Sequence, residues 1–175
     1  NFSEWKAAMN SMQLTNFNTV YADKYDTIFY VSNGLLPKRT PGFDYSGTVP
    51  GNTKKTLWTE FHAFQDLPQQ VNPSSGYLFN TNHSPFKASG MEDNLFYKDY
   101  PVEMGFDLRD NNRSVRFREL MPDTGRISWE DFERIKFDQT LPPNLAFRTD
   151  MTALFSLDSL AHEDIKSQIH RLQSW

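Results

Sequence analysis

The sequence lacks cysteine, long apolar runs and a large excess of either charge. None of its 175 residues is cysteine, so it contains no disulfide and no thiolate metal site. No apolar stretch approaches the roughly 18 residues that would predict a membrane span, and we see no signal peptide. The formal net charge is −4, from 18 basic and 22 acidic residues. That balance argues against a nucleic-acid partner, because phosphate binding needs a concentrated basic surface.

The sequence also lacks a complete set of catalytic residues. No G-x-S-x-G pattern marks a serine nucleophile. Only His162 and His170 have a spacing that would place two histidines on one helix, and zinc needs three or four ligands. Carboxylates are plentiful, and we expect most of them to cap helices or face solvent. The chain begins without methionine, and we interpret it as a piece of a longer protein.

The first half of the chain, residues 1–100, is predicted to contain the strands and long loops. Apolar residues at helical spacing predict a first helix with Ser3 as its N-cap, and they are Phe2, Trp5, Met9 and Met12. Residues 18–23 and 27–32 are rich in β-branched and aromatic side chains and flank a three-residue turn, which predicts a β-hairpin. Residues 33–56 read as loop, and residues 76–79 as a short strand.

The second half, residues 101–175, is predicted to be helical. Residues 113–121 have the composition of a helix, and Ser128 with Asp131 forms a capping-box pattern. Ile165, Ile169 and Leu172 predict a last amphipathic helix. We therefore expect one partial domain, residues 1–175, of the α+β class.

The densest polar cluster lies in residues 72–85, NPSSGYLFNTNHSP, and comprises Asn72, Asn80, Asn82 and His83. If the short strand continues, Asn80 and Asn82 point to the same face. A rigidly held Asn amide is an N–H donor that stabilises the oxyanion of acyl transfer. Alternatively, the amides satisfy nearby loop backbone. Chemistry alone leaves both interpretations open.

This segment resembles the NPxxGyixnaNnxP signature of the penicillin acylase family of N-terminal-nucleophile hydrolases, which includes acyl-homoserine-lactone acylases. Further motifs agree in order and spacing, and they are NTVYAD, IFYVSNGLLPKR, the Pro50-Gly51 pair followed by Trp58, and ISWEDFERIKFD. The resemblance runs from about Phe2 to Trp175. It implies an internal fragment of the large subunit, from an αββα fold, with strands in the first half and helices in the second.

The resemblance also implies roles for individual residues. Asn82 matches the catalytic Asn of the oxyanion hole, and Arg113 matches an Arg beside the nucleophile. Phe17 matches a position on the wall of the acyl pocket. Asp93 and Tyr45 match ligands of a structural calcium ion, a site that would be incomplete here, and no cofactor is expected for catalysis.

Two features depart from the family pattern. His83 stands where the family usually has Asn, and the hairpin turn lacks its usual Gly. Asn1 is not a plausible nucleophile, so we expect the nucleophile to lie outside this chain and the isolated chain to be inactive.

The resemblance implies a periplasmic or secreted amidohydrolase for a small N-acyl substrate, whose other parts are the rest of the large subunit and a small subunit. A non-catalytic ligand-binding domain on the same scaffold is the alternative. We expect the isolated fragment to self-associate through exposed apolar residues such as Trp58, Phe61 and Phe79.

Overall fold

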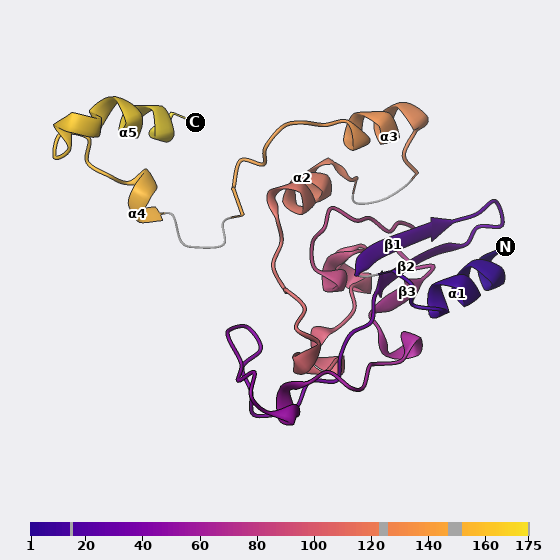
Figure 1. Ribbon diagram of the computed structural model, residues 1–175. Helices are drawn as coiled ribbons and strands as arrows, with labels where there is room; N and C mark the ends of the chain where they lie inside the picture. Colours follow the sequence, from indigo (N-terminus) through magenta and orange to yellow (C-terminus); the bar gives the residue numbers. More distant parts are fainter. Residues whose placement is uncertain (15, 123–125, 147–151, 175) are drawn as a thin grey trace.

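The computed structural model describes residues 1–14, 16–122, 126–146 and 152–174. Three antiparallel strands form a sheet in the order β1-β2-β3 (Figure 1). They are β1 (Phe17–Ala22), β2 (Ile28–Asn33) and β3 (Gln69–Val71). The predicted hairpin is confirmed, and its register runs from the Phe17–Asn33 pair to the Ala22–Ile28 pair.

An acidic side chain shapes the hairpin turn in place of the usual Gly. Oδ1 of Asp23 accepts hydrogen bonds from the backbone N–H groups of Tyr25, at 2.8 Å, and Thr27, at 3.2 Å. Asp26 adopts a positive φ of 60°. Asp tolerates this left-handed conformation better than most residues because its short polar side chain bonds locally. The turn therefore closes without glycine.

Helix α1 (Phe2–Asn10) packs on one face of the hairpin and closes the main core. The predicted cap at Ser3 is wrong, because Oδ1 of Asn1 accepts from the backbone N–H of Glu4 at 3.1 Å and Ser3 lies inside the helix. The buried core consists of Phe29, Val31, Phe64 and Leu67. The four apolar residues of the predicted helical face pack against it, although the last, Met12, lies beyond the helix end.

The predicted strand at residues 76–79 is wrong, and the third strand is β3, where Val71 pairs with Phe29. The ring of Phe79 stacks on Phe117 with centroids 3.9 Å apart. Residues 76–79 are thus apolar because Phe79, only 6% exposed, packs against a helix and not because they join the sheet. The expected exposure of Phe79 is also wrong, whereas Trp58 and Phe61 are 55% and 42% exposed.

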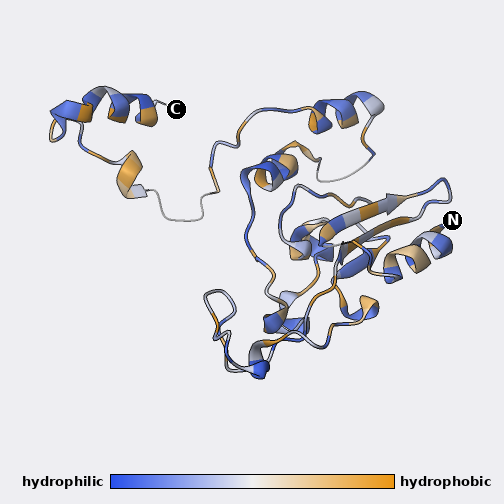
Figure 2. Ribbon diagram, in the orientation of Figure 1, coloured by the Kyte–Doolittle hydropathy of each residue, from blue (hydrophilic) through white to orange (hydrophobic). Residues whose placement is uncertain are grey.

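The later part of the chain carries helices α2 (Asn112–Leu120), α3 (Trp129–Lys136), α4 (Thr152–Phe155) and α5 (Lys166–Gln173). The predicted helix at residues 113–121 and the Ser128 cap are confirmed, since Oγ of Ser128 accepts from the N–H of Asp131 at 3.0 Å. Hydrophobic and hydrophilic residues alternate along α3 (Figure 2). Helices α4 and α5 lie apart from the sheet (Figure 1).

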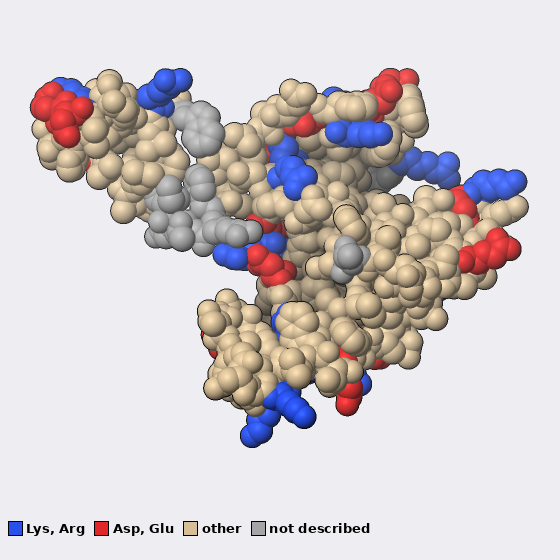
Figure 3. Space-filling view, viewed as in Figure 1, with Lys and Arg blue, Asp and Glu red and all other residues tan. Residues whose placement is uncertain are grey.

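The remaining connections are irregular, as predicted for residues 33–56. Single-turn 3₁₀ helices interrupt the loops, and they are Lys54–Thr56, Phe64–Asp66, Pro85–Lys87, Met91–Asp93, Tyr97–Asp99, Val102–Met104 and Glu163–Ile165. The mixture of helices with a small antiparallel sheet confirms the α+β class. Within the described ranges, no helix is both long and apolar enough to span a membrane. On the face in Figure 3, basic and acidic side chains are interspersed.

Candidate active site

The site begins with a tight turn at residues 80–82 that follows the buried Phe79. Asn82 has a positive φ of 59°, which is unusual for a residue other than glycine. Its backbone N–H donates to Oδ1 of Asn80 at 2.8 Å. The prediction that Asn80 and Asn82 share one face of a strand is therefore wrong. Asn80 instead stabilises the turn that presents Asn82.

Side-chain amides attach this turn to strand β1. Nδ2 of Asn18 donates to Oδ1 of Asn80 and to the backbone carbonyl of His83, both at 3.2 Å. Nδ2 of Asn80 donates back to the carbonyl of Asn18 at 3.2 Å. The turn is thereby fixed to the sheet by polar contacts. Asn72 belongs to a different contact, since its Oδ1 accepts from the N–H of Ile28 at 2.8 Å.

Arg113, at the start of α2, contacts the side chain of Asn82. Its Nη2 donates to Oδ1 of Asn82 at 3.1 Å, and both residues are exposed. A guanidinium group can only donate hydrogen bonds, so the side-chain oxygen of Asn82 must face Arg113. The N–H₂ group of the same amide therefore points away from Arg113. The geometry thus leaves Asn82 oriented as a hydrogen-bond donor. The family resemblance implied that both residues belong to the active site, and the structure places their side chains in contact.

A third residue, Asn111, joins the two elements that carry this pair. It is the N-cap of α2, and its Nδ2 donates to the carbonyls of Thr81, at 2.9 Å, and Asn82, at 3.3 Å. The sequence reasoning missed Asn111 and Asn18. For Asn111 the available signal was the Asn111-Asn112 pair that precedes the predicted helix at residues 113–121, because Asn is a favoured N-cap.

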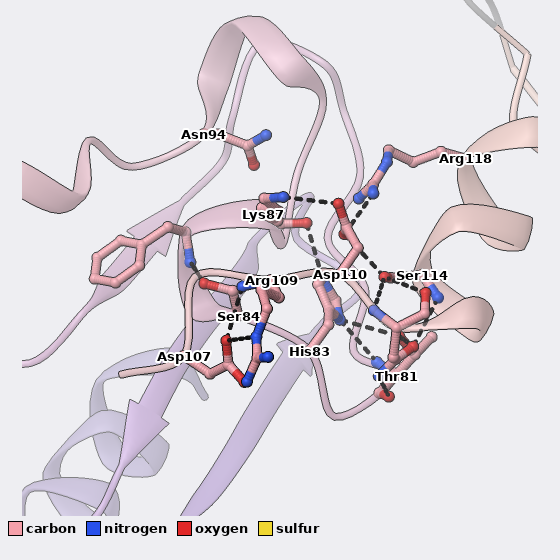
Figure 4. Close-up of polar contacts among 12 residues, drawn as sticks. Thr81, His83, Ser84, Lys87, Asn94, Asp107, Arg109, Asp110, Ser114 and Arg118 are labelled. Atoms are coloured by element: carbon pink, nitrogen blue, oxygen red, sulfur yellow. Dashed lines mark hydrogen bonds and ion pairs between the residues drawn. The ribbon is translucent and has the colours of Figure 1, made fainter. Parts of the chain in front are cut away.

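His83 is buried beneath the turn and serves as a polar anchor (Figure 4). Its ring stacks on Phe79 with centroids 4.4 Å apart. Nε2 lies 2.8 Å from the carbonyl of Lys87, and Nδ1 lies 3.2 Å from the backbone nitrogen of Thr81. A carbonyl accepts and an N–H donates, so the neutral ring with its proton on Nε2 satisfies both contacts. Burial lowers the pKa of His83, which favours that neutral form.

Asp110 gathers charged partners beside this histidine (Figure 4). Its carboxylate pairs with Nζ of Lys87 at 2.7 Å and with the guanidinium of Arg118, and it accepts from Oγ of Ser114 at 2.9 Å. Although burial opposes ionisation, these donors lower the pKa of Asp110 to about 2. The ionised carboxylate therefore ties α2 to the segment that follows His83.

Two cavities adjoin this arrangement. One, of about 430 Å³, is lined by residues that include Phe17, Asn82 and Arg109. The other, of about 660 Å³, is largely apolar and is lined by residues that include Arg113 and Phe117. The structure therefore brings Phe17, 57% exposed, to the same concave surface as Asn82. Arg113 lines the second cavity and Asn82 the first, so neither of these two cavities is lined by both side chains.

The remaining predicted residues lie in other contacts. The carboxylate of Asp93 accepts from Oγ of Ser74 at 2.7 Å and from the N–H of Ser75 at 2.5 Å, and these bonds lower its pKa. The ring of Tyr45 lies 5.6 Å from the guanidinium carbon of Arg39. Among the described residues, no three His, Cys, Asp or Glu side chains gather as a metal site.

Comparison with known proteins finds relatives of this sequence. The sequence model of the penicillin amidase family matches residues 1–175. Penicillin G acylase from Escherichia coli is 40% identical over 87 residues, which are 50% of this chain and 10% of that protein. The chain thus spans only a small part of this relative's length. Because the family match covers every residue, the chain belongs to the penicillin amidase family.

Proposed function

We propose that the protein carrying this chain is an amidohydrolase that cleaves an acyl–amide bond, and that Asn82 donates to its oxyanion hole. The single observation that carries the proposal is the 3.1 Å contact from Arg113 to Oδ1 of Asn82. It directs the Asn82 N–H₂ group toward a different partner. During attack on an amide, the carbonyl oxygen becomes negative, and such a donor stabilises it.

The attacking nucleophile is supplied from outside this chain. In this mechanism a Ser, Thr or Cys at the start of the large subunit attacks the amide carbonyl, and its own α-amino group acts as the base. The tetrahedral oxyanion then accepts from Nδ2 of Asn82 and from a backbone N–H elsewhere. Phe17 contributes an apolar surface to the acyl side of the same cavity. The isolated chain, without the nucleophile, is inactive.

Membership of the penicillin amidase family supports a wider assembly. The chain packs with the remainder of the large subunit and with a small subunit, and the substrate is a small N-acyl compound. The name of the Escherichia coli relative, penicillin G acylase, supports an amide substrate. The mature protein acts in the periplasm or outside the cell, and fractionation of cells that produce it tests that location.

A structural calcium ion would use Asp93 and the backbone carbonyl of Tyr45. The bonds from Ser74 and Ser75 favour the ionised form of Asp93, which is the form that calcium binds. The remaining ligands would come from outside this chain, and the ion would supply structural cross-linking. Metal analysis of the complete protein should find calcium in the wild type and less in Asp93→Asn. Equal calcium in both would remove Asp93 from the site.

The proposed function is tested in the complete protein with Asn82→Ala and a panel of N-acyl substrates. Loss of one oxyanion donor should lower kcat by about 10²–10³-fold, because the donor acts mainly in the transition state. KM should change little. Wild-type turnover in Asn82→Ala would remove Asn82 from the mechanism. The absence of any hydrolysis by the wild type, together with saturable binding of an N-acyl ligand, would favour the non-catalytic binding domain.

A further inference from the structure

Asn111 occupies the junction between the turn that carries Asn82 and the helix that carries Arg113. As the N-cap of α2, its Oδ1 accepts from the backbone N–H of Ser114 at 2.9 Å. Its own backbone N–H donates to Oγ of Ser114 at 3.0 Å, which completes a reciprocal cap. These two hydrogen bonds with Ser114 fix the first turn of α2, and Arg113 is the second residue of that helix.

The other contacts of Asn111 fix the turn at Asn82. Nδ2 of Asn111 donates to the carbonyls of Thr81 and Asn82, at 2.9 and 3.3 Å. Thr81 and Ser114, both labelled in Figure 4, are each hydrogen-bonded to Asn111. One planar amide thus contacts both elements. Its oxygen caps the helix at 2.9 Å and also accepts a long contact from Oγ1 of Thr81 at 3.5 Å, and its nitrogen makes the two shorter bonds to the turn carbonyls. The two elements are separated by about thirty residues of chain, as the separation of 30 between Thr81 and Asn111 shows.

We infer that Asn111 is a positioning residue for the reaction, acting through the Arg113–Asn82 contact. Arg113 has a long side chain that loses considerable rotamer freedom when it is held in one geometry. Its bond to Asn82 is maintained only if the start of α2 and the turn keep a constant separation. Asn111 sets that separation and thereby the direction of the Asn82 N–H₂ group. This inference rests on the proposed function.

A residue that merely capped the helix would need only its acceptor oxygen. Asn and Asp are almost equally good N-caps, because each offers a side-chain oxygen to the first-turn N–H groups. Asp has no N–H₂ group, so it cannot donate to the carbonyls of Thr81 and Asn82. The substitution Asn111→Asp therefore keeps the cap and removes both bonds to the turn carbonyls, so that only the long 3.5 Å contact from Oγ1 of Thr81 to the side-chain oxygen remains. Asn111→Ser also keeps a favoured cap but adds no charge.

The matched control is Asn94→Asp. Oδ1 of Asn94 accepts from the backbone N–H and Oγ of Ser89, at 3.2 and 3.3 Å, and a carboxylate preserves both contacts. This substitution makes the same chemical change at a site away from Asn82. Asn94→Asp should retain the kcat and the thermal stability of the wild type, because it keeps both contacts.

The experiment measures kcat, KM and thermal unfolding of the complete protein with its best N-acyl substrate. Asn111→Asp and Asn111→Ser should each lower kcat by about 10- to 100-fold, which is the effect expected of a small displacement of a catalytic group. KM should stay within about twofold, because ground-state binding is preserved. Wild-type kcat in both variants, or failure of both to fold, would overturn the inference.

A double-mutant cycle separates this inference from the proposed function. If Asn111 acts through Asn82, then adding Asn111→Asp to Asn82→Ala should change kcat by less than about twofold. An equal loss in both backgrounds would overturn the inference, since it would show an effect independent of Asn82. If Asn82→Ala alone lowers kcat but the Asn111 variants do not, only this inference fails. If Asn82→Ala has no effect, the proposed function fails.

Discussion

The β1–β2 hairpin and the turn at residues 80–82 differ in what fixes their backbone. The hairpin has a regular hydrogen-bond ladder, and its buried residues Phe29 and Val31 join the apolar core. The turn has no ladder, and Asn82 sits in a left-handed conformation. The amides of Asn80, Asn18 and Asn111 fix it instead.

This difference means that one region of the molecule mainly determines stability, whereas the other mainly determines the direction of a functional group. Burial of apolar surface is non-directional and tolerates small shifts. Hydrogen bonds require short distances and good angles, and they therefore determine where a group points. The hairpin supplies stability and a platform, whereas the amides around the turn supply direction. We therefore expect substitutions in the two regions to change different measured quantities.

The largest effect on stability is expected at the hairpin. Phe29 is 1% exposed and packs against the rings of Phe2 and Trp5, with centroids 5.2 and 5.7 Å away. Phe29→Ala should lower the free energy of unfolding by about 3–5 kcal/mol, because it removes buried apolar surface and leaves a cavity. Denaturant unfolding measures this change.

The control for this prediction is Phe96→Ala, because Phe96 is 57% exposed. It should change the free energy of unfolding by less than about 1 kcal/mol. In the complete protein, the folded fraction of Phe29→Ala should keep a kcat close to wild type. A selective loss of kcat in that fraction would show that the core also directs the site.

A smaller effect on stability is expected from protonation of His83. Its Nδ1 accepts from Thr81 only when the ring is neutral, and burial holds its pKa below the ordinary 6.5. The charged groups around it are Asp110, which favours protonation, and Arg118 and Lys87, which oppose it. Because the unfolded chain takes up this proton first, stability is full above about pH 6.5 and decreases as the pH falls toward the lowered pKa.

The measurement is the free energy of unfolding between pH 7.5 and about pH 5, where one proton contributes at most about 1.4 kcal/mol per pH unit. His83→Asn, which introduces the residue usual in the family, should remove this part of the pH dependence. His170→Gln, at an exposed position on α5, should leave it unchanged. An unchanged pH profile in His83→Asn would contradict the role of the neutral ring.

The same difference explains what the sequence could predict. The hairpin and helices α2 and α3 were predictable because local composition and periodicity determine them. The turn at Asn82 depends on amides of Asn18 and Asn111, and the contact between Asn18 and Asn80 spans 62 positions. The composition and periodicity of a short segment cannot predict hydrogen bonds to residues so far away in the sequence. Asn82 was part of the polar cluster that the residues themselves indicated, but only the family resemblance favoured its catalytic role and pointed to Arg113. Residues 76–79 read as a strand because the packing of Phe79 on α2 was not visible.

The most direct test of the central claim is kcat for Asn82→Asp in the complete protein. The carboxylate still accepts from Arg113, but the N–H₂ donor is absent and a negative charge faces the developing oxyanion. The account predicts a loss in kcat of about 10³-fold or more, with no decrease in thermal stability. A kcat within about threefold of wild type would show that the donor at Asn82 does not act in the transition state and would contradict the account.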